Sequence, residues 1–357
     1  MTLNRDDILA TLAQIIDPNS GKDIVAADYV RGLTIDGADV RFVLEVPPQF
    51  GAKMEPLRAV AERAVAAMDG VGRVSVLLTA HEAKAPPPDL KIGRHPTAQQ
   101  GAGKARVPGV KHLVAIGSGK GGVGKSTVSS NLAVALAAQG LKVGLLDADV
   151  YGPSQPRMMG VNARPKSPDG KTIIPLQAHG VVLMSMGFMI GEAEAVIWRG
   201  PMLMGALQQL LGQVEWGALD VLLIDLPPGT GDVQLTLGQR YEVTGAVIVS
   251  TPQDVALLDA RKAIDMFKKL DVPVLGMIEN MSTHICRNCG HEEQIFGHGG
   301  ARAEAEAQGM DYLGALPLDL DIRLAGDGGT PIAAARPDSA QARGFAAIAA
   351  ELAKKLR

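Results

Sequence analysis

Cysteine is almost absent from this 357-residue chain, which has only Cys286 and Cys289. Two cysteines cannot form the disulfide framework of a secreted protein, and their C-x-x-C spacing points instead to metal binding or thiol redox chemistry. Because such a pair suits a reducing compartment, we expect a cytoplasmic protein.

Aromatic residues, long apolar runs and an excess of charge are also lacking. Aromatics make up 3% of the chain, so the core must consist of Ala, Val, Leu, Ile and Met. A net charge of -3 gives no general footprint for nucleic acid or an anionic membrane, and we expect neither partner. The longest apolar run, VVLMSMGFMI, is too short to cross a bilayer and predicts a buried strand or helix. The first residues, MTLNRDDILATLAQIIDP, carry two aspartates where a signal peptide needs an apolar segment.

The pattern along the chain predicts two folded parts and a linker. Residues 1–80 indicate a small α/β domain, with helices in RDDILATLAQIID and MEPLRAVAERAVAAM and strands in VRFVLEV and RVSVLLT. Residues 81–108 are rich in Pro, Gly, Lys and Gln without periodicity, which is typical of a flexible linker. Residues 109–357 form the larger part.

The larger part alternates continuous apolar strands with helical segments. The expected strands lie in KHLVAIGS, KVGLLDAD, VLLIDLP, GAVIVST and VPVLGMIEN, and SAQARGFAAIAAELAKKLR is expected to be a closing helix. Apolar strands flanked by helices imply a parallel sheet that is covered on both faces. We therefore predict an α/β fold with a mostly parallel, doubly wound sheet.

A glycine-rich loop between a predicted strand and a predicted helix matches the pattern of a phosphate-binding loop, GxxxxGK[ST]. Its glycines let backbone N–H groups approach phosphate oxygens, and the helix N-terminus favours negative charge. Lys125 is expected to neutralise the β- and γ-phosphates, Ser126 to ligate Mg²⁺, and Thr127 to contact the α-phosphate. The expected ATP-binding residues of the loop are Gly119, Lys120, Gly121, Gly122, Val123, Gly124, Lys125, Ser126 and Thr127.

Acidic residues follow two of the apolar strands, at the edge where such sheets bind ligands. Asp147 and Asp149 follow one strand; Asp225 follows another and precedes a turn that contains Gly229. Asp225 is expected to hold Mg²⁺ through water, and Asp149 to orient the attacking water. A single aspartate at such a place is usually a helix cap or turn residue, but three after a phosphate loop favour a nucleotide site.

The additional lysine of KGGVGKST, Lys120, carries a resemblance. The loop is similar to the deviant Walker A motif of the MinD, ParA, ArsA and nitrogenase iron protein group of ATPases. That resemblance implies an ATP-dependent homodimer in which Lys120 reaches the partner's phosphates and acts with Lys125 and Asp149 in hydrolysis. The alternative is an exposed loop lysine that serves its own site.

The cysteine pair supplies two thiolates, whereas a metal site of this kind needs further ligands. A two-fold dimer would bring four thiolates together, enough for a [4Fe–4S] cluster. Two alternatives stay open: His284, His291 or His298 completing a Cys₂His₂ zinc site, or an uncoordinated redox dithiol.

Further motifs narrow the resemblance. VYGPSQPRMMG, WRGPM, DLPPGTGD, STPQDVALLDARKA, MIENMS and CRNCGHEEQIFGHGG, in this order, resemble the Mrp/ApbC branch over about residues 108–340. The resemblance implies an ATP-hydrolysing carrier that passes an iron–sulfur cluster from an assembly scaffold to apo-proteins. It also implies that Asn280 contacts the adenine and that the segment around Pro317 lines the base pocket.

Residues 1–80 resemble the small iron–sulfur assembly-type domain often fused in front of bacterial members. Free-standing versions of that domain often carry a cysteine near a strand–helix junction, and the corresponding VPPQFGAKMEP has none. We therefore expect a docking or assembly role for this domain rather than thiol chemistry.

Two other functions share the loop with two lysines. A positioning or partition ATPase would bind membrane or DNA, and would need a basic amphipathic C-terminal helix or a basic face. FAAIAAELAKKLR is Ala-rich and reads first as a packed helix. A nitrogenase-like reductase is the other alternative, but the clustered C-x-x-C is closer to the carrier pattern.

Overall fold

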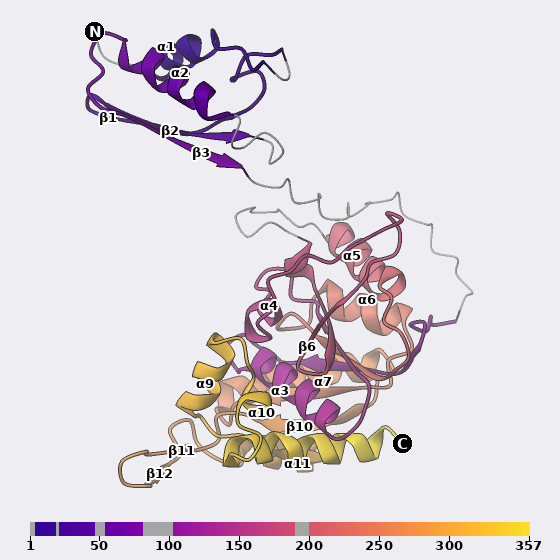
Figure 1. Cartoon of the computed structure of the whole chain (residues 1–357). Coiled ribbons are helices and arrows are strands. Elements are labelled where there is room, and N and C mark those ends of the chain that lie inside the picture. Colours follow the sequence, from indigo (N-terminus) through magenta and orange to yellow (C-terminus); the bar gives the residue numbers. More distant parts are fainter. Residues whose placement is uncertain (1–3, 19–20, 47–53, 81–102, 190–199) are drawn as a thin grey trace. The chain divides into compact units, whose positions relative to one another are not determined.

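The structure, a computed structural model, describes the chain except residues 1–3, 19–20, 47–53, 81–102 and 190–199. Contacts divide the chain into two compact units, Met1–Pro86 and Pro87–Arg357 (Figure 1). Most of the predicted linker lies outside the described residues, as do most of VPPQFGAKMEP and the Trp198 end of WRGPM. Of the predicted linker, residues 103–108 are described, and there the Ala105 N–H donates to the Arg240 carbonyl.

The first unit is a three-stranded sheet with two helices. Its elements are α1 (Arg5–Leu12), β1 (Val30–Asp36), β2 (Asp39–Val46), α2 (Glu55–Ala66) and β3 (Val74–Ala80). The strands lie in the order β1-β2-β3, the first pair antiparallel and the second parallel. Alternate residues of β2 are buried, as expected for a strand with one covered face. The helices cover that face (Figure 1).

The second unit contains the remaining elements. Its strands are β4 (Val110–Gly117), β5 (Val143–Asp147), β6 (Leu176–Ala178), β7 (Val181–Ser185), β8 (Leu219–Asp225), β9 (Gly245–Ser250), β10 (Val274–Glu279), β11 (His284–Ile285), β12 (Glu292–Glu293) and β13 (Tyr312–Ala315). Its α-helices are α3 (Lys125–Ala138), α4 (Gln155–Met158), α5 (Gly200–Gln213), α6 (Asp232–Arg240), α7 (Asp254–Lys269), α8 (Gly300–Ala307), α9 (Leu320–Asp327), α10 (Ile332–Ala335) and α11 (Ala340–Lys355).

The large sheet of this unit has eight strands in the order β13-β10-β9-β4-β8-β5-β7-β6. Every pair is parallel except β6 with β7, which confirms the predicted α/β fold with a mostly parallel sheet. The run VVLMSMGFMI begins as the mostly buried strand β7 and continues as a 3₁₀ turn over Met186–Phe188, and its last residue, Ile190, lies outside the described residues. After β4, the chain first forms β5 on one side of β4 and later forms β9 on the other side. The C-terminal end of β4 is therefore a topological switch point of the sheet.

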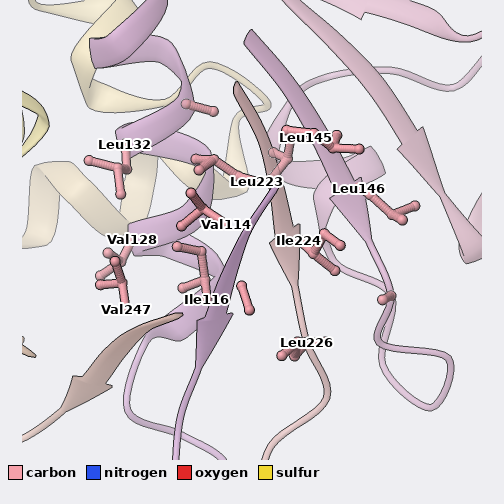
Figure 2. Packing of buried hydrophobic residues seen from close by; sticks show 14 of the residues in the cluster. Val114, Ile116, Val128, Leu132, Leu145, Leu146, Leu223, Ile224, Leu226 and Val247 are labelled. Atoms are coloured by element: carbon pink, nitrogen blue, oxygen red, sulfur yellow. The ribbon is translucent and has the colours of Figure 1, made fainter. Parts of the chain in front are cut away.

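The core explains why these strands lack alternation. Every residue of β5 and of β9 is buried, as a sheet covered on both faces requires. Figure 2 shows Val114 and Ile116 of β4 beside Val128 and Leu132 of α3, with side chains of β5 and β8 in the same cluster. This packing holds the start of α3 at the end of β4. Within the described residues, none of the helices is long and apolar enough to span a bilayer.

Candidate functional site

The loop between β4 and α3 has glycine where its neighbours leave no room for a side chain. A Cβ at Gly119 would lie 2.1 Å from the backbone carbonyl carbon of Asp259 in α7. Gly124 has a φ of 79°, and a Cβ there would lie 2.2 Å from the amide nitrogen of Asn280. Backbone–backbone contact and left-handed φ therefore account for these glycines, and the loop N–H groups lead into the N-terminus of α3.

Lys125, the first residue of α3, is buried and pairs with a carboxylate from another strand. Its Nζ lies 2.5 Å from Oδ1 of Asp225, the last residue of β8, and the Ser129 hydroxyl donates to the same oxygen at 2.9 Å. The amide of Gln155 donates to the other oxygen at 2.8 Å. One carboxylate thus joins the loop lysine, helix α3 and the start of α4.

Asp147, the last residue of β5, is a second fully buried carboxylate. Burial, followed by the charge of Asp225, raises the pKa of Asp147 to about 7. Backbone N–H groups of Asp149, Ser154 and Gln155 and the hydroxyl of Ser185 all donate to it. These donors fold the segment after β5 back around the carboxylate.

Asp149 lies at the mouth of this arrangement. It accepts from the Gly152 N–H at 3.2 Å and lines a cavity of about 570 Å³, together with Tyr151 and the turn after β8. In that turn the Gly229 N–H donates to the Ser118 carbonyl at 2.9 Å. The structure therefore brings together the loop, both acidic motifs and the Gly229 turn, as the sequence predicted they would meet at one edge of the sheet.

The two lysines of the loop differ in their surroundings. Lys125 is 6% exposed and paired, whereas Lys120 is partly exposed and its ammonium has no ion pair among the described residues. No carboxylate of the described residues therefore holds the Lys120 ammonium in its own site.

Asn280 and Pro317 lie on neighbouring segments beyond β10 and β13. The buried amide of Asn280 donates to the Val123 carbonyl of the loop at 2.8 Å. The chain just before Pro317 is held by Ser282, whose N–H donates to Leu316 at 3.0 Å. The Asn280 amide is thus bonded to the phosphate loop.

The cysteines occupy a small hairpin, residues 284–293, formed by β11 and β12. The Cys286 N–H donates to the His291 backbone carbonyl, and the Gly290 N–H donates to the Cys286 backbone carbonyl, both at 2.8 Å. N–H donation from Cys289, then Asn288, lowers the pKa of the Cys286 thiol, so the turn favours a thiolate there. Both thiols are free, and Cys289 is exposed.

Histidine does not complete this pair in one chain. Nowhere among the described residues do three or more His, Cys, Asp or Glu side chains gather as a metal site. The Nδ1 atom of His284 is hydrogen-bonded to the Leu318 carbonyl oxygen at 3.1 Å, and the Nδ1 atom of His298 lies 3.7 Å from the Glu279 carboxylate. The Cys₂His₂ alternative is therefore not supported among the described residues.

The comparisons with known proteins decide the family. The family model described as NUBPL iron-transfer P-loop NTPase, a ParA-type model, matches residues 109–353. The chain belongs to this family. A second model, described as iron–sulfur cluster assembly protein, matches residues 5–76. Both resemblances inferred from the motifs are confirmed.

Relatives with assigned names are similar to this chain over most of their own length. An iron–sulfur cluster carrier protein of Helicobacter pylori is 43% identical over 98% of this chain and 92% of its own. The carrier protein of Escherichia coli is 53% identical over 70% of this chain and 67% of its own.

Solved structures agree with the fold. A nucleotide-binding protein of Archaeoglobus fulgidus, in complex with ADP, is 40% identical with a TM-score of 0.56, covering 63% of this chain and 88% of that one. The cell division ATPase MinD of Pyrococcus furiosus is 24% identical with a TM-score of 0.53, covering 68% and 99%. The latter supports the fold alone.

Several polar residues of this iron-transfer NTPase escaped the sequence analysis. Gln155 appeared only inside a motif, yet it is fully buried and also donates to the Ser126 carbonyl at 2.9 Å. Glu279 is fully buried, and its carboxylate accepts from the Gly299 and Ala301 N–H groups at the start of α8. For Glu279 the only available signal was a polar residue at the end of an apolar strand, and for Gln155 it was its place inside the motif VYGPSQPRMMG.

Proposed function

We propose that this protein is an ATP-hydrolysing iron–sulfur carrier that binds a [4Fe–4S] cluster at a homodimer interface and delivers it to apo-proteins. The observation that carries the proposal is the cysteine hairpin. It presents two thiols on a P-loop NTPase fold, and the described residues add no third ligand. Four thiolates then require a second chain, because a [4Fe–4S] cluster takes four. The names of the relatives support iron–sulfur cargo.

The nucleotide half of the proposal rests on the end of β4. We infer that Lys125 neutralises phosphate charge and that Lys120 meets the phosphates of the partner subunit. Asp149, beside the cavity, orients the attacking water. Lys125 must exchange its pairing with Asp225 for phosphate oxygens, so nucleotide binding and the Asp225 carboxylate are linked.

Mg²⁺ suits the oxygen donors found here. The Oε1 of Gln155 and the Oγ of Ser154 are buried and accept no hydrogen bond from the described residues. The Gln155 amide also donates to the Ser126 carbonyl and to the Asp225 carboxylate, so Gln155, Ser126 and Asp225 bring oxygen donors to one place, and oxygen donors are the ligands that Mg²⁺ prefers. Ser126 would hold the ion directly and Asp225 through water. When bound, the ion would neutralise charge on the β- and γ-phosphates.

The positioning-ATPase alternative has less support. It depends on a free amphipathic C-terminal helix, but Phe345, Ile348 and Leu352 of α11 are buried in the core. Its two terminal lysines pair with Glu351 and Asp311. The helix therefore uses its apolar face inside its own unit.

Anaerobic reconstitution of the full chain tests the proposal. We expect iron and sulfide near one cluster for two chains, and loss of both in Cys286→Ala and in Cys289→Ala. His291→Ala in the same hairpin is the matched control and should load normally. A cysteine variant that keeps its iron, or wild type that takes up zinc alone, contradicts the carrier function.

A further inference from the structure

Residues 316–321 follow β13 and include the start of α9. This segment contacts the C-terminal end of strand β10 and the residues just after it. The Leu316 N–H donates to the Glu279 carbonyl at 2.8 Å, and both the N–H and the hydroxyl of Ser282 donate to the Leu316 carbonyl. Glu279 directly precedes Asn280, which is bonded to the phosphate loop. One end of this segment is therefore tied to the nucleotide side of the sheet.

The other end of segment 316–321 is tied to the cysteine hairpin. The Leu318 N–H donates to the Thr283 carbonyl at 2.8 Å, and the His284 ring contacts the Leu318 carbonyl at 3.1 Å. Figure 1 shows β11 and β12 projecting beside α9. The segment thus connects the end of β10, next to Asn280, with the base of the cysteine hairpin within one chain.

Arg287, between the two cysteines in the sequence, clamps the hairpin to this bridge. Its guanidinium lies 2.7 Å from Asp321 and 3.6 Å from Asp319. The side chains of Asp321 and Asp319 are 20% and 14% exposed, so water hydrates their charges only in part and a paired cation is favourable. Among the described residues, this is the only cation by which the hairpin forms an ion pair.

The acidic side of the clamp is fixed independently. Asp319 caps α9 through the Asp321 N–H at 2.7 Å and accepts from Gln341 at 2.9 Å. The second oxygen of Asp321 is bonded by Arg336 at 2.7 Å. A shift of the start of α9 must therefore move Arg287, and the turn carrying both thiols with it, or break the ion pair.

We propose that Arg287 is a positioning residue that couples nucleotide occupancy to the exposure of Cys286 and Cys289, through segment 316–321 and Asp321. The inference rests on the proposed nucleotide site and gives the hairpin a route to it inside a single chain. Nucleotide that moves the base-pocket segment repositions the thiols before any partner subunit is involved. Such coupling is reciprocal, so a modification that fixes the hairpin must also change nucleotide affinity.

Thiol alkylation of the full-length, metal-free protein tests this coupling. Because Cys286 and Cys289 are the only cysteines, the iodoacetamide reaction rate reports on the hairpin alone. We expect saturating ADP to change the wild-type rate roughly fivefold or more, the lower end of measured couplings. In Arg287→Ala the rates with and without ADP should become equal. Comparing this ratio cancels the effect of the lost charge on thiol reactivity.

Two further variants isolate the clamp. Asp321→Asn removes the acidic partner of the Arg287–Asp321 ion pair, so it should also abolish the effect of ADP on the alkylation rate. Arg336→Ala removes the other partner of Asp321, leaves Arg287 paired, and should keep the wild-type ratio. ADP affinity, measured by calorimetry, should shift on alkylation of wild type and should not shift in Arg287→Ala.

Three results overturn the inference: no ADP effect in wild type, a wild-type ratio in Arg287→Ala, or loss of the ratio in Arg336→Ala. The assay contains no iron. If wild type shows the coupling but takes up no cluster on reconstitution, the carrier function fails while the coupling stands. If wild type loads a cluster but shows no ADP effect, only the coupling fails.

Discussion

At the scale of single residues, Asp225 collects the donors that organise the nucleotide side of the sheet. Lys125, Ser129 and Gln155 reach it from two helices, and Asp147 lies close enough for its pKa to respond to Asp225. Because the pKa of Asp147 is raised to about 7, Lys125 balances the charge of Asp225 until Asp147 ionises. The site is net negative once Asp147 is ionised, which suits a divalent cation.

Gln155 is expected to set the response of hydrolysis to Mg²⁺. Gln155→Met keeps the length of the side chain but removes both hydrogen bonds and the unpaired Oε1. A hydrogen bond to a charged group is worth about 1.5–3 kcal/mol, so the half-saturating Mg²⁺ concentration should rise roughly tenfold or more. Steady-state ATPase assays over a Mg²⁺ series measure this.

Gln139→Met is the matched control for that series. Its amide donates to the Ala346 carbonyl at the exposed end of α3, far along the helix from the site. An unchanged Mg²⁺ dependence in Gln155→Met, or an equal change in both variants, would show that Gln155 does not position the carboxylate.

The raised pKa of Asp147 predicts how the stability of the fold depends on pH. Its pKa is raised from 3.8 to about 7 by burial and by Asp225, so the folded chain holds a proton that the unfolded chain has released. The free energy of unfolding should therefore fall as pH rises from about 4 to about 7. The fall should be a few kcal/mol, because one unit of pKa shift corresponds to about 1.4 kcal/mol.

Denaturant titrations without nucleotide at several pH values check this. Asp147→Asn lacks the titrating group, so wild type should lose stability relative to the variant across that window. A stability difference between the two proteins that does not vary with pH contradicts the assignment.

At the scale of elements, the phosphate loop depends on how closely α7 approaches it. Gly119→Ala places a Cβ against the backbone of Asp259, which cannot move without shifting the helix. Overpacking of this kind costs about 1–3 kcal/mol, and we expect that loss in unfolding free energy even without nucleotide.

Gly121→Ala, two residues along, provides the comparison for chemical denaturation. Its Cβ would meet nothing closer than Pro228 at 3.9 Å, and its backbone is not left-handed. It should lie within about 0.5 kcal/mol of wild type. Equal stability of the two variants would mean that the contact with α7 does not determine this glycine.

At the scale of the whole molecule, the two units have separate hydrophobic clusters, and all of the proposed nucleotide and cysteine residues lie in the second. A chain that lacks residues 1–86 should therefore bind ADP as the full chain does. Isothermal titration compares the two directly. A clear loss of affinity would assign the first unit a part in the nucleotide site.

The proposed homodimer predicts that Lys120 and Lys125 differ in what their loss does. Lys120→Ala should still bind ATP, because Lys125 remains, but should lose hydrolysis by a factor of about 10²–10³, the usual effect of removing one group that stabilises transition-state charge. Lys125→Ala should instead lose binding. Hydrolysis at the wild-type rate in Lys120→Ala would make it an ordinary loop lysine.

Local pattern predicted much of the fold, and its failures have physical causes. Continuous apolar runs predicted the places of β4, β5, β8, β9 and β10, because the C-terminal half of each strand is buried on both faces. Strand β1 was not predicted: Gly32 has a φ of 57°, and its register shifts between Arg31 and Thr34, which breaks the alternation. The order of the strands also had no local signal.

The sequence by itself determined the phosphate loop, the acidic strand ends, the cysteine pair and the two folded parts, since each depends on neighbours within a few residues. Only the tertiary structure decided which side chains meet. Gln155 reaches Asp225 across 70 positions, and Arg287 reaches Asp321 across a β-hairpin, a helix and a strand. Such contacts depend on the order in which a parallel sheet places distant strand ends along one edge, and periodicity carries no information about that order.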